Sequence, residues 1–400
     1  MRAVFAALAP VAGMLVACGG ADSTGVFEEL MGLVPDTPEV RRQVLFTDFE
    51  RLRELRRIEL PTDPADPEQQ RQYLLGLLGA ADPRTGGSLS EGVLIYAFPL
   101  PGFSNGRSRT FIFDIVSTHE ASIGFGFEAV DQLLAAGGFA PGESEYAVAA
   151  GAFDPTLAEQ LLTECAGCAL RTDMRRYRDQ RYFGWGDSGS VTRPLSPPAF
   201  DAAGIAFRLA FRDRYVLRSG STAQMEALID AALGDGSLAS NEDYLLVARG
   251  LEELDSYTAF VTDRTQGPEM AAAMLSAFGD DAQSAALRAA WARDAGVPLL
   301  QPYDLVGFGV AYSDSGGFYT TLVLVHGSEG AARANGELLA RRIATVTSVL
   351  TGTPWSLLIE TVETEVDGRV LQATLRPREG ATVVNAVALF SRFDPLLLHE

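Results

Sequence analysis

The feature that most restricts the fold of this chain is a repeated junction in which a predicted strand runs directly into a capped helix. In the clearest case, the strand Tyr146–Phe153 ends at Asp154, whose carboxylate can accept hydrogen bonds from the first free N–H groups of a helix. Pro155 fits the first helical position because the donor that it lacks would be unpaired there in any case. The helix that follows has one apolar side, formed by Leu157, Ala158, Leu161, Leu162 and Cys165.

Three further junctions of this kind begin at Asp48, Ser221 and Ser328. Between them lie predicted hairpins with short turns, in which the preferred two-residue turn Asp367-Gly368 indicates type I′ geometry. The sequence therefore predicts an α+β fold with mixed, mainly antiparallel sheets and packed helices. Other predicted strands are Val44–Phe46, Val93–Phe98, Thr110–Val116 and Tyr257–Thr262, and the hairpin pairs Gly204–Phe211 with Arg214–Arg218, Val306–Tyr312 with Phe318–Val325, and Leu357–Val366 with Arg369–Leu375. Other expected helices are Phe27–Leu33, Gln69–Leu78, Glu128–Ala136, Glu242–Glu253 and the region Pro268–Asp294.

The spacing of the capped junctions predicts two similar α+β units. The separation of Asp48 from Ser221 nearly equals that of Asp154 from Ser328, and the proline-rich stretch Pro194–Pro198 lies between the two pairs. We therefore expect domains at residues 26–195 and 199–400. Residues 1–17 are expected to be a signal peptide, and residues 18–25 a flexible tether.

Composition limits the chemistry that this chain can perform. All 32 basic residues are arginine, which excludes mechanisms that need a lysine, such as Schiff-base formation. The formal charge of −20 makes the surface repel phosphate backbones, so we expect no nucleic-acid partner.

The N-terminus carries the clearest functional signal. After the positive Met1-Arg2, the apolar run from Ala3 to Val16 is too short to span a bilayer comfortably and is typical of an export signal. It ends in Leu15-Val16-Ala17-Cys18, which resembles the bacterial lipobox. This resemblance implies cleavage before Cys18 and attachment of a diacylglyceryl group to its sulfur. The expected location is the cell envelope, outside the cytoplasm, with contact to the membrane through the N-terminal lipid only.

The remaining cysteines, Cys165 and Cys168, form a Cys-x-x-Cys pair at the end of the predicted helix. In oxidoreductases such a pair begins a helix, where the positive end of the dipole lowers the thiol pKa. Here the helix end disfavours the thiolate, so we expect a structural disulfide or a buried thiol pair.

Several short motifs are better explained by turns than by catalysis. Gly186-Asp187-Ser188-Gly189 resembles the nucleophile motif of chymotrypsin-like proteases, but His119, the only upstream histidine, lacks the family's context. Together with Asp314-Ser315-Gly316, the same tetrapeptide resembles the paired loops of aspartic proteases. Asp, Ser and Gly are also the residues that turns select, so we predict no catalytic residue.

The sequence predicts no metal site and no cofactor. His119, His326 and His399 are far apart, and no histidine pair has metal-ligand spacing. Asp63, Asp66 and Glu68 could bind calcium weakly, but no EF-hand loop is present and a solvated acidic loop is the favoured interpretation. Glu360, Glu363 and Glu365 lie on a predicted hairpin, where Glu363 and Glu365 share the solvent-facing side, so we assign no acid–base pair.

Three functions remain open. The first is a lipid-anchored, non-catalytic envelope protein that binds an unidentified protein or small molecule, because the body is similar to uncharacterised lipid-anchored bacterial envelope proteins. The second is the solute-binding component of an importer, although the predicted hairpins differ from the parallel-sheet lobes of such proteins. The third is an extracytoplasmic hydrolase with an unrecognised carboxylate site.

Overall fold

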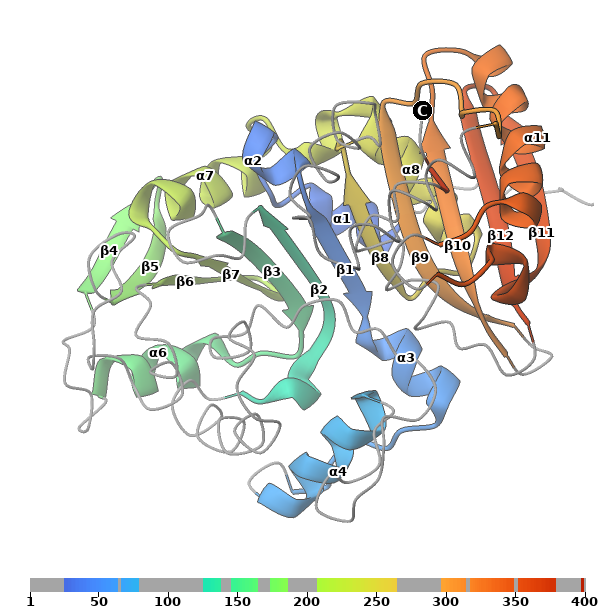
Figure 1. Cartoon of the computed structure of the whole chain (residues 1–400). Helices are drawn as coiled ribbons and strands as arrows, with labels where there is room; N and C mark the ends of the chain where they lie inside the picture. The colour runs from blue at the N-terminus through green and yellow to red at the C-terminus, as the bar shows by residue number, and fades with distance from the viewer. Residues whose placement is uncertain are drawn as a thin grey trace, which may run out of the picture.

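The protein has an α+β fold built on one antiparallel sheet. The computed structural model describes residues 25–63, 66–78, 125–137, 145–164, 173–185, 207–264, 296–313, 317–348, 352–378 and 397–398. Within these residues twelve strands form a single sheet in the order β11-β12-β10-β9-β8-β1-β2-β3-β7-β6-β5-β4, and Figure 1 shows β4 and β11 at its two ends. The strands are β1 Val44–Asp48, β2 Val130–Gly137, β3 Glu145–Gly151, β4 Asp173–Tyr177, β5 Gln180–Trp185, β6 Phe207–Arg212, β7 Tyr215–Ser219, β8 Thr258–Thr262, β9 Leu305–Ser313, β10 Gly317–Val325, β11 Ile359–Asp367 and β12 Val370–Pro377.

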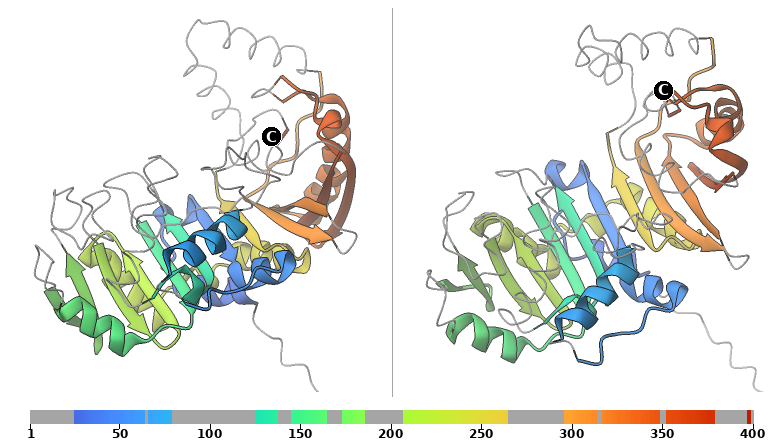
Figure 2. Two further views of the ribbon diagram at one scale, coloured as in Figure 1. Left: turned by 90° about the horizontal axis from the view of Figure 1, so that it is seen from below. Right: turned by 60° about the horizontal axis from the view of Figure 1, so that its bottom comes forward.

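Helices cover both faces of this sheet (Figures 1 and 2). On one face, here called the α7–α8 face, α1, α7 and α8 share a core with alternate residues of the central strands, among them Phe46, Leu134 and Val148. The opposite face, the α6–α11 face, is covered by α3, α4 and α6 over one half of the sheet and by α11 over the other. The helices are α1 Val26–Met31, α2 Pro38–Arg41, α3 Phe49–Arg56, α4 Pro67–Leu78, α6 Pro155–Glu164, α7 Thr222–Ala232, α8 Glu242–Glu253 and α11 Glu329–Thr345, with short 3-10 turns η2 Phe127–Ala129, η3 Leu238–Ser240 and η4 Trp355–Leu357.

All four predicted caps are confirmed. Asp48 Oδ1 accepts from Arg51 N at 2.9 Å, and Asp154 Oδ1 accepts from Thr156 N at 2.9 Å. The hydroxyls of Ser221 and Ser328 each accept from the N–H three residues later at 3.3 Å. These bonds satisfy helix donors that have no partner within the helix, so each cap fixes where its helix begins.

The prediction of a helix at Glu128–Ala136 is wrong, because this stretch is mostly β2. Leucine and alanine favour helices intrinsically, but β2 lies between β1 and β3 with both of its faces covered. A strand buried on both faces has no polar alternation, so its sequence looks like that of a buried helix.

Two smaller expectations are also corrected. Leu157 was expected on the buried side of α6, but it is 41% exposed, and Ala158 and Leu162 face the core instead. Asp367 pairs with Val370, so the turn residues are Gly368 and Arg369. Only Gly368 has a positive φ, which is the pattern of a type II′ turn.

The strand order is symmetric about the contact between β1 and β8. Moving outward on one side, β1 is followed by β2, β3, β7 and β6; on the other, β8 is followed by β9, β10, β12 and β11. Helices α6 and α11 follow β3 and β10 in the chain and lie on the same face of the sheet. Beyond β6, the β4–β5 hairpin extends one side.

The sheet mixes strands from the two segments expected as domains. β8 pairs with β1, β7 with β3, and β6 with β5. The linker Pro194–Pro198 and the strands expected at Val93–Phe98 and Thr110–Val116 lie outside the described residues. No helix among the described residues is long and apolar enough to cross a membrane.

Candidate functional site

Most sequence-predicted site residues lie outside the described residues. These are Cys18, Cys165, Cys168, Asp187, Ser188, His119, His399 and the stretch Asp314-Ser315-Gly316. The lipid attachment and the Cys165–Cys168 pair therefore remain predictions.

His326 is fully buried and held by the fold. Its Nδ1 lies 3.2 Å from the carbonyl oxygen of Arg369, and its Nε2 lies 2.8 Å from Asn335 Nδ2. Because the amide of Asn335 donates, Nε2 accepts, and Nδ1–H donates to the carbonyl. The histidine therefore joins the end of β10 to α11 and to the turn between β11 and β12. Asn335 in turn accepts from Gln301 N at 2.6 Å, which connects α11 to the segment before β9. These contacts give His326 a structural role.

The acidic groups singled out in the sequence do not converge. Asp66 caps α4, accepting from Glu68 N at 2.9 Å. Glu360, Glu363 and Glu365 are exposed on β11, and Glu363 Oε1 lies 3.7 Å from Arg376 Nε. Within the described part of the chain, no group of three or more histidine, cysteine, aspartate or glutamate side chains is placed to hold a metal ion.

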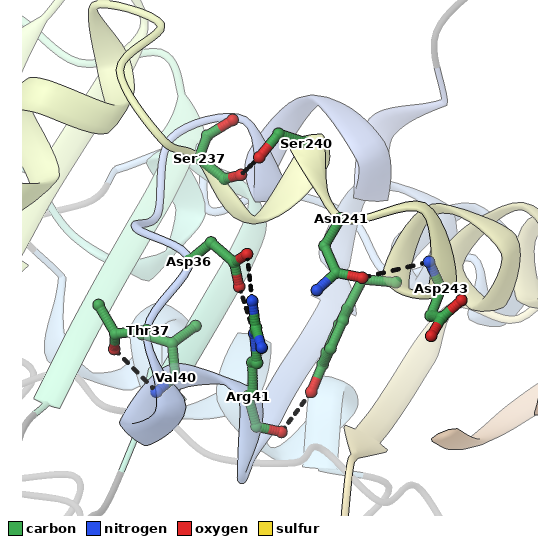
Figure 3. Close-up of polar contacts among 9 residues, drawn as sticks. Asp36, Thr37, Val40, Arg41, Ser237, Ser240, Asn241 and Asp243 are labelled. Atoms are coloured by element: carbon green, nitrogen blue, oxygen red, sulfur yellow. Dashed lines mark hydrogen bonds and ion pairs between the residues drawn. The ribbon is translucent and has the colours of Figure 1, made fainter. Parts of the chain in front are cut away.

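A polar cluster lies in the middle of the sheet, beside the first residues of β1 and the last residues of β8 (Figure 3). Arg41 donates from Nε and Nη2 to the two carboxylate oxygens of Asp36, both at 2.6 Å, and Figure 3 shows the two side chains facing each other. Tyr244 on α8 donates to the carbonyl of Arg41. Burial raises the pKa of Tyr244 far above its usual range, so its hydroxyl stays protonated. The cluster therefore holds α2 against α8.

Near this cluster, burial also raises the pKa of Asp263, against the opposing effect of Arg264, Arg41 and Arg42. Sequence reasoning did not identify Arg41, Tyr244 or Asp263, because the three come together only when β1 and β8 pair. No local motif marks them.

Two partly buried carboxyls lie at the opposite end of the same strands. Glu252 Oε1 accepts from Phe27 N at 2.7 Å, and so caps α1 from the end of α8. Burial raises the pKa of Glu252, with smaller contributions from Glu28 and Asp48, and burial likewise raises the pKa of Asp48. Carboxyls that resist ionisation are typical of acid–base sites. Here both are occupied as acceptors at helix starts, which makes them structural groups sensitive to pH.

The arginine edge is a group of exposed, positively charged side chains at one end of the sheet. We use this name for Arg175, Arg176, Arg178 and Arg181 of the β4–β5 hairpin, whose side chains are between 43% and 68% exposed. Their ion pairs with Asp173, Asp179, Asp235 and Glu159 lie at the surface, where such pairs contribute little. The guanidinium groups therefore remain accessible to a partner.

The glutamate edge lies at the other end of the sheet. It consists of Glu360, Glu363, Glu365 and Asp367 of β11, all exposed. A strand crowded with charged side chains is the sequence signal of a sheet edge. This signal is present in both stretches, but without the strand order it does not reveal that they end the same sheet.

Comparison with known proteins assigns no relative. No family model matches the chain, and neither a curated protein nor a solved structure shows significant similarity to it.

Proposed function

We propose that this protein is a lipid-anchored, non-catalytic component of a bacterial cell envelope that binds a protein partner at its arginine edge. The proposed location in the cell rests on the sequence Leu15-Val16-Ala17-Cys18 and the glycine-rich tether after it. A diacylglyceryl group on Cys18 would hold the folded domain at the extracytoplasmic surface of a membrane.

The observation that carries the binding proposal is the position of β4. It ends the sheet, its residues Asp173–Arg176 are all exposed, and among the described strands it pairs on one side only, with β5. The outer N–H and C=O groups of an edge strand can bind an extended segment of another protein by strand addition. Arginines on that strand attract an acidic segment and repel a basic one. The proposed partner is therefore an acidic extended segment of a protein.

The importer hypothesis is weaker. Solute-binding components of importers have two parallel-sheet lobes, whereas every neighbouring pair of described strands here is antiparallel. No observation on the described residues favours the hydrolase.

We further propose that the sheet contains two copies of one α+β unit related by an approximate two-fold axis between β1 and β8. The symmetric strand order and the shared placement of α6 and α11 support this. The equivalence of Asp154 with Ser328 fits the proposed axis, but that of Asp48 with Ser221 does not, because the counterpart of β1 is β8 and not β7. An experimental structure in which β1-β2-β3-α6 and β8-β9-β10-α11 fail to superpose would refute the duplication.

The proposed lipid attachment, and with it the location in the envelope, is tested by labelling cells with a radioactive fatty acid. Wild-type protein is expected to carry label, and Cys18→Ala is expected to lose it. Equal labelling of the two proteins would contradict lipid attachment at Cys18.

The binding site is tested with a photo-crosslinking amino acid at Met174, which is 55% exposed on β4. We expect crosslinks to a protein from this position in the native envelope. The control position is Leu60, which is 52% exposed in the segment between α3 and α4, away from β4. If position 174 crosslinks no protein, or if position 60 gives the same products, the proposed edge is not a binding site.

A further inference from the structure

The other end of the sheet indicates which partner the arginine edge binds, an inference that rests on the binding function proposed above. We propose that the arginine edge of one copy of this chain binds the glutamate edge of the next copy, so that the sheet continues from molecule to molecule. The charges of the two edges are opposite: arginines predominate on the β4–β5 hairpin, whereas β11 carries four carboxylates and no basic residue.

The direction of the strands permits this contact. All eleven neighbouring pairs in the sheet are antiparallel, so β11 and β4, at the two ends of twelve strands, run in opposite directions. A second copy placed next along the sheet in the same orientation therefore presents its β11 antiparallel to β4 of the first. Such a head-to-tail contact needs no reversal of either molecule.

The faces of the two edge strands also match. Tyr177 packs on the core of the α7–α8 face, so Arg175, two residues earlier, lies on that face too. On β11, Val362 and Val366 pack on the core of the α6–α11 face, which places Glu363 and Glu365 on the α7–α8 face. When the sheet continues, Arg175 of one copy meets Glu363 or Glu365 of the next.

The apolar side of the contact is complementary as well. Met174 pairs with Phe183, whose ring belongs to the core of the α6–α11 face, so Met174 lies on that face with 55% of its surface exposed. Val362 and Val366 are half-buried on the same face of β11. Continuation of the sheet covers Met174 with these valines.

Symmetric pairing of identical edges is disfavoured by charge. Two β4 strands paired in this way would place Arg175 or Arg176 opposite its own copy, and two β11 strands would oppose Glu363 and Glu365. Like charges directly opposite each other destabilise antiparallel pairs. The head-to-tail arrangement is the one in which opposite charges meet, and it produces a row of molecules or, if it closes, a ring.

Sedimentation velocity tests this contact on the full chain carrying Cys18→Ala, which removes lipid-driven assembly. At low ionic strength, about 20 mM, we expect the weight-average sedimentation coefficient to rise with protein concentration. At about 500 mM, screening should return the protein to monomer. R175E/R176E and E363R/E365R are each expected to stay monomeric, because each leaves like charges on its two edges.

The decisive sample is an equimolar mixture of these two variants. Each edge of one then meets an oppositely charged edge of the other, so association is expected to return. R333E/R341E, which changes the same charge on the exposed side of α11, serves as the matched control and should associate like the parent chain. Circular dichroism before each run verifies that every variant is folded.

A parent chain that stays monomeric at low salt, or edge variants that associate as the parent does, would overturn the proposal. A mixture of the edge variants that remains monomeric would also overturn it. These outcomes differ from failure of the binding function, because crosslinks from position 174 to a different protein would leave the arginine edge a binding site whose partner is not a second copy.

Discussion

Asp48 combines a helix cap with a carboxyl that burial makes harder to ionise. Asp48→Asn keeps the acceptor for Arg51 N and removes the charge, so its free energy of unfolding at pH 7 should equal or exceed that of wild type. Asp48→Ala removes the acceptor and should lower that free energy by about 1 kcal/mol. Urea unfolding measures both. Equal losses in the two variants would show that the charge of Asp48, and not its cap, stabilises α3.

Glu252 gives the fold a pH dependence of known sign. Its pKa is raised by burial above the value of 4.5 for a free side chain, so the folded state binds the proton more tightly than the unfolded state. This contribution to stability is present at low pH and is lost as the pH rises from about 4.5 through the folded-state pKa.

Glu252→Gln keeps an acceptor for Phe27 N and cannot ionise. The Tm of this variant minus that of wild type should therefore increase between pH 4.5 and pH 7. Differential scanning calorimetry across this range, with Glu337→Gln on the exposed side of α11 as control, measures the trend. A difference that stays constant or falls with pH would contradict it.

The sequence predicts single residues well where their partners are local. Asp48, Asp154, Ser221 and Ser328 were all identified as caps because the donor that each accepts lies two or three residues away. The contacts of His326 and Tyr244 were not predictable, because their partners join the site only after distant strands have paired.

At the scale of elements, β2 illustrates how environment overrides propensity. Its leucines and alanines predict a helix, but β1 and β3 supply its backbone partners and helices cover both faces. The hairpins β6–β7, β9–β10 and β11–β12 were predicted to within three residues, because turn chemistry and strand alternation act over short distances in the sequence. The β4–β5 hairpin was not predicted.

The assignment of β2 as a central strand has a testable energetic consequence. Leu134 is completely buried, so Leu134→Ala should lower the free energy of unfolding by about 2–5 kcal/mol. Leu157→Ala on α6, at a site 41% exposed, should change it by less than about 0.5 kcal/mol. Urea titrations of both variants measure the contrast. Similar small losses would mean that Leu134 does not face the core.

For the whole molecule, the sequence predicted the fold class but not the strand order. The pairing of β8 with β1 joins residues more than two hundred positions apart, and no local pattern encodes such a contact. The core of the α7–α8 face contains residues from α1 through β12, which makes the two expected domains share one core.

This shared core predicts a single cooperative unfolding transition. Trp185 belongs to β5, near one end of the sheet, and Trp355 is fully buried beside β11 at the other. In variants that retain only one of the three tryptophans, urea curves from fluorescence and from far-UV circular dichroism should coincide. If fluorescence at one end changes at a lower urea concentration than the dichroism of the same variant, the halves unfold independently.

The hydrogen bond from Phe27 N to Glu252 fixes the beginning of α1 to the end of α8. The segment between Cys18 and Gly25 therefore sets how far the folded domain can lie from the lipid attachment. Seven peptide units separate Cys18 from Gly25, and a fully extended chain spans at most about 25 Å over that length. If Cys18 carries the lipid, the first helix stays within that radius of the bilayer. Neighbouring copies would then share one plane, a crowded two-dimensional setting in which a weak lateral contact is populated far more than in dilute solution.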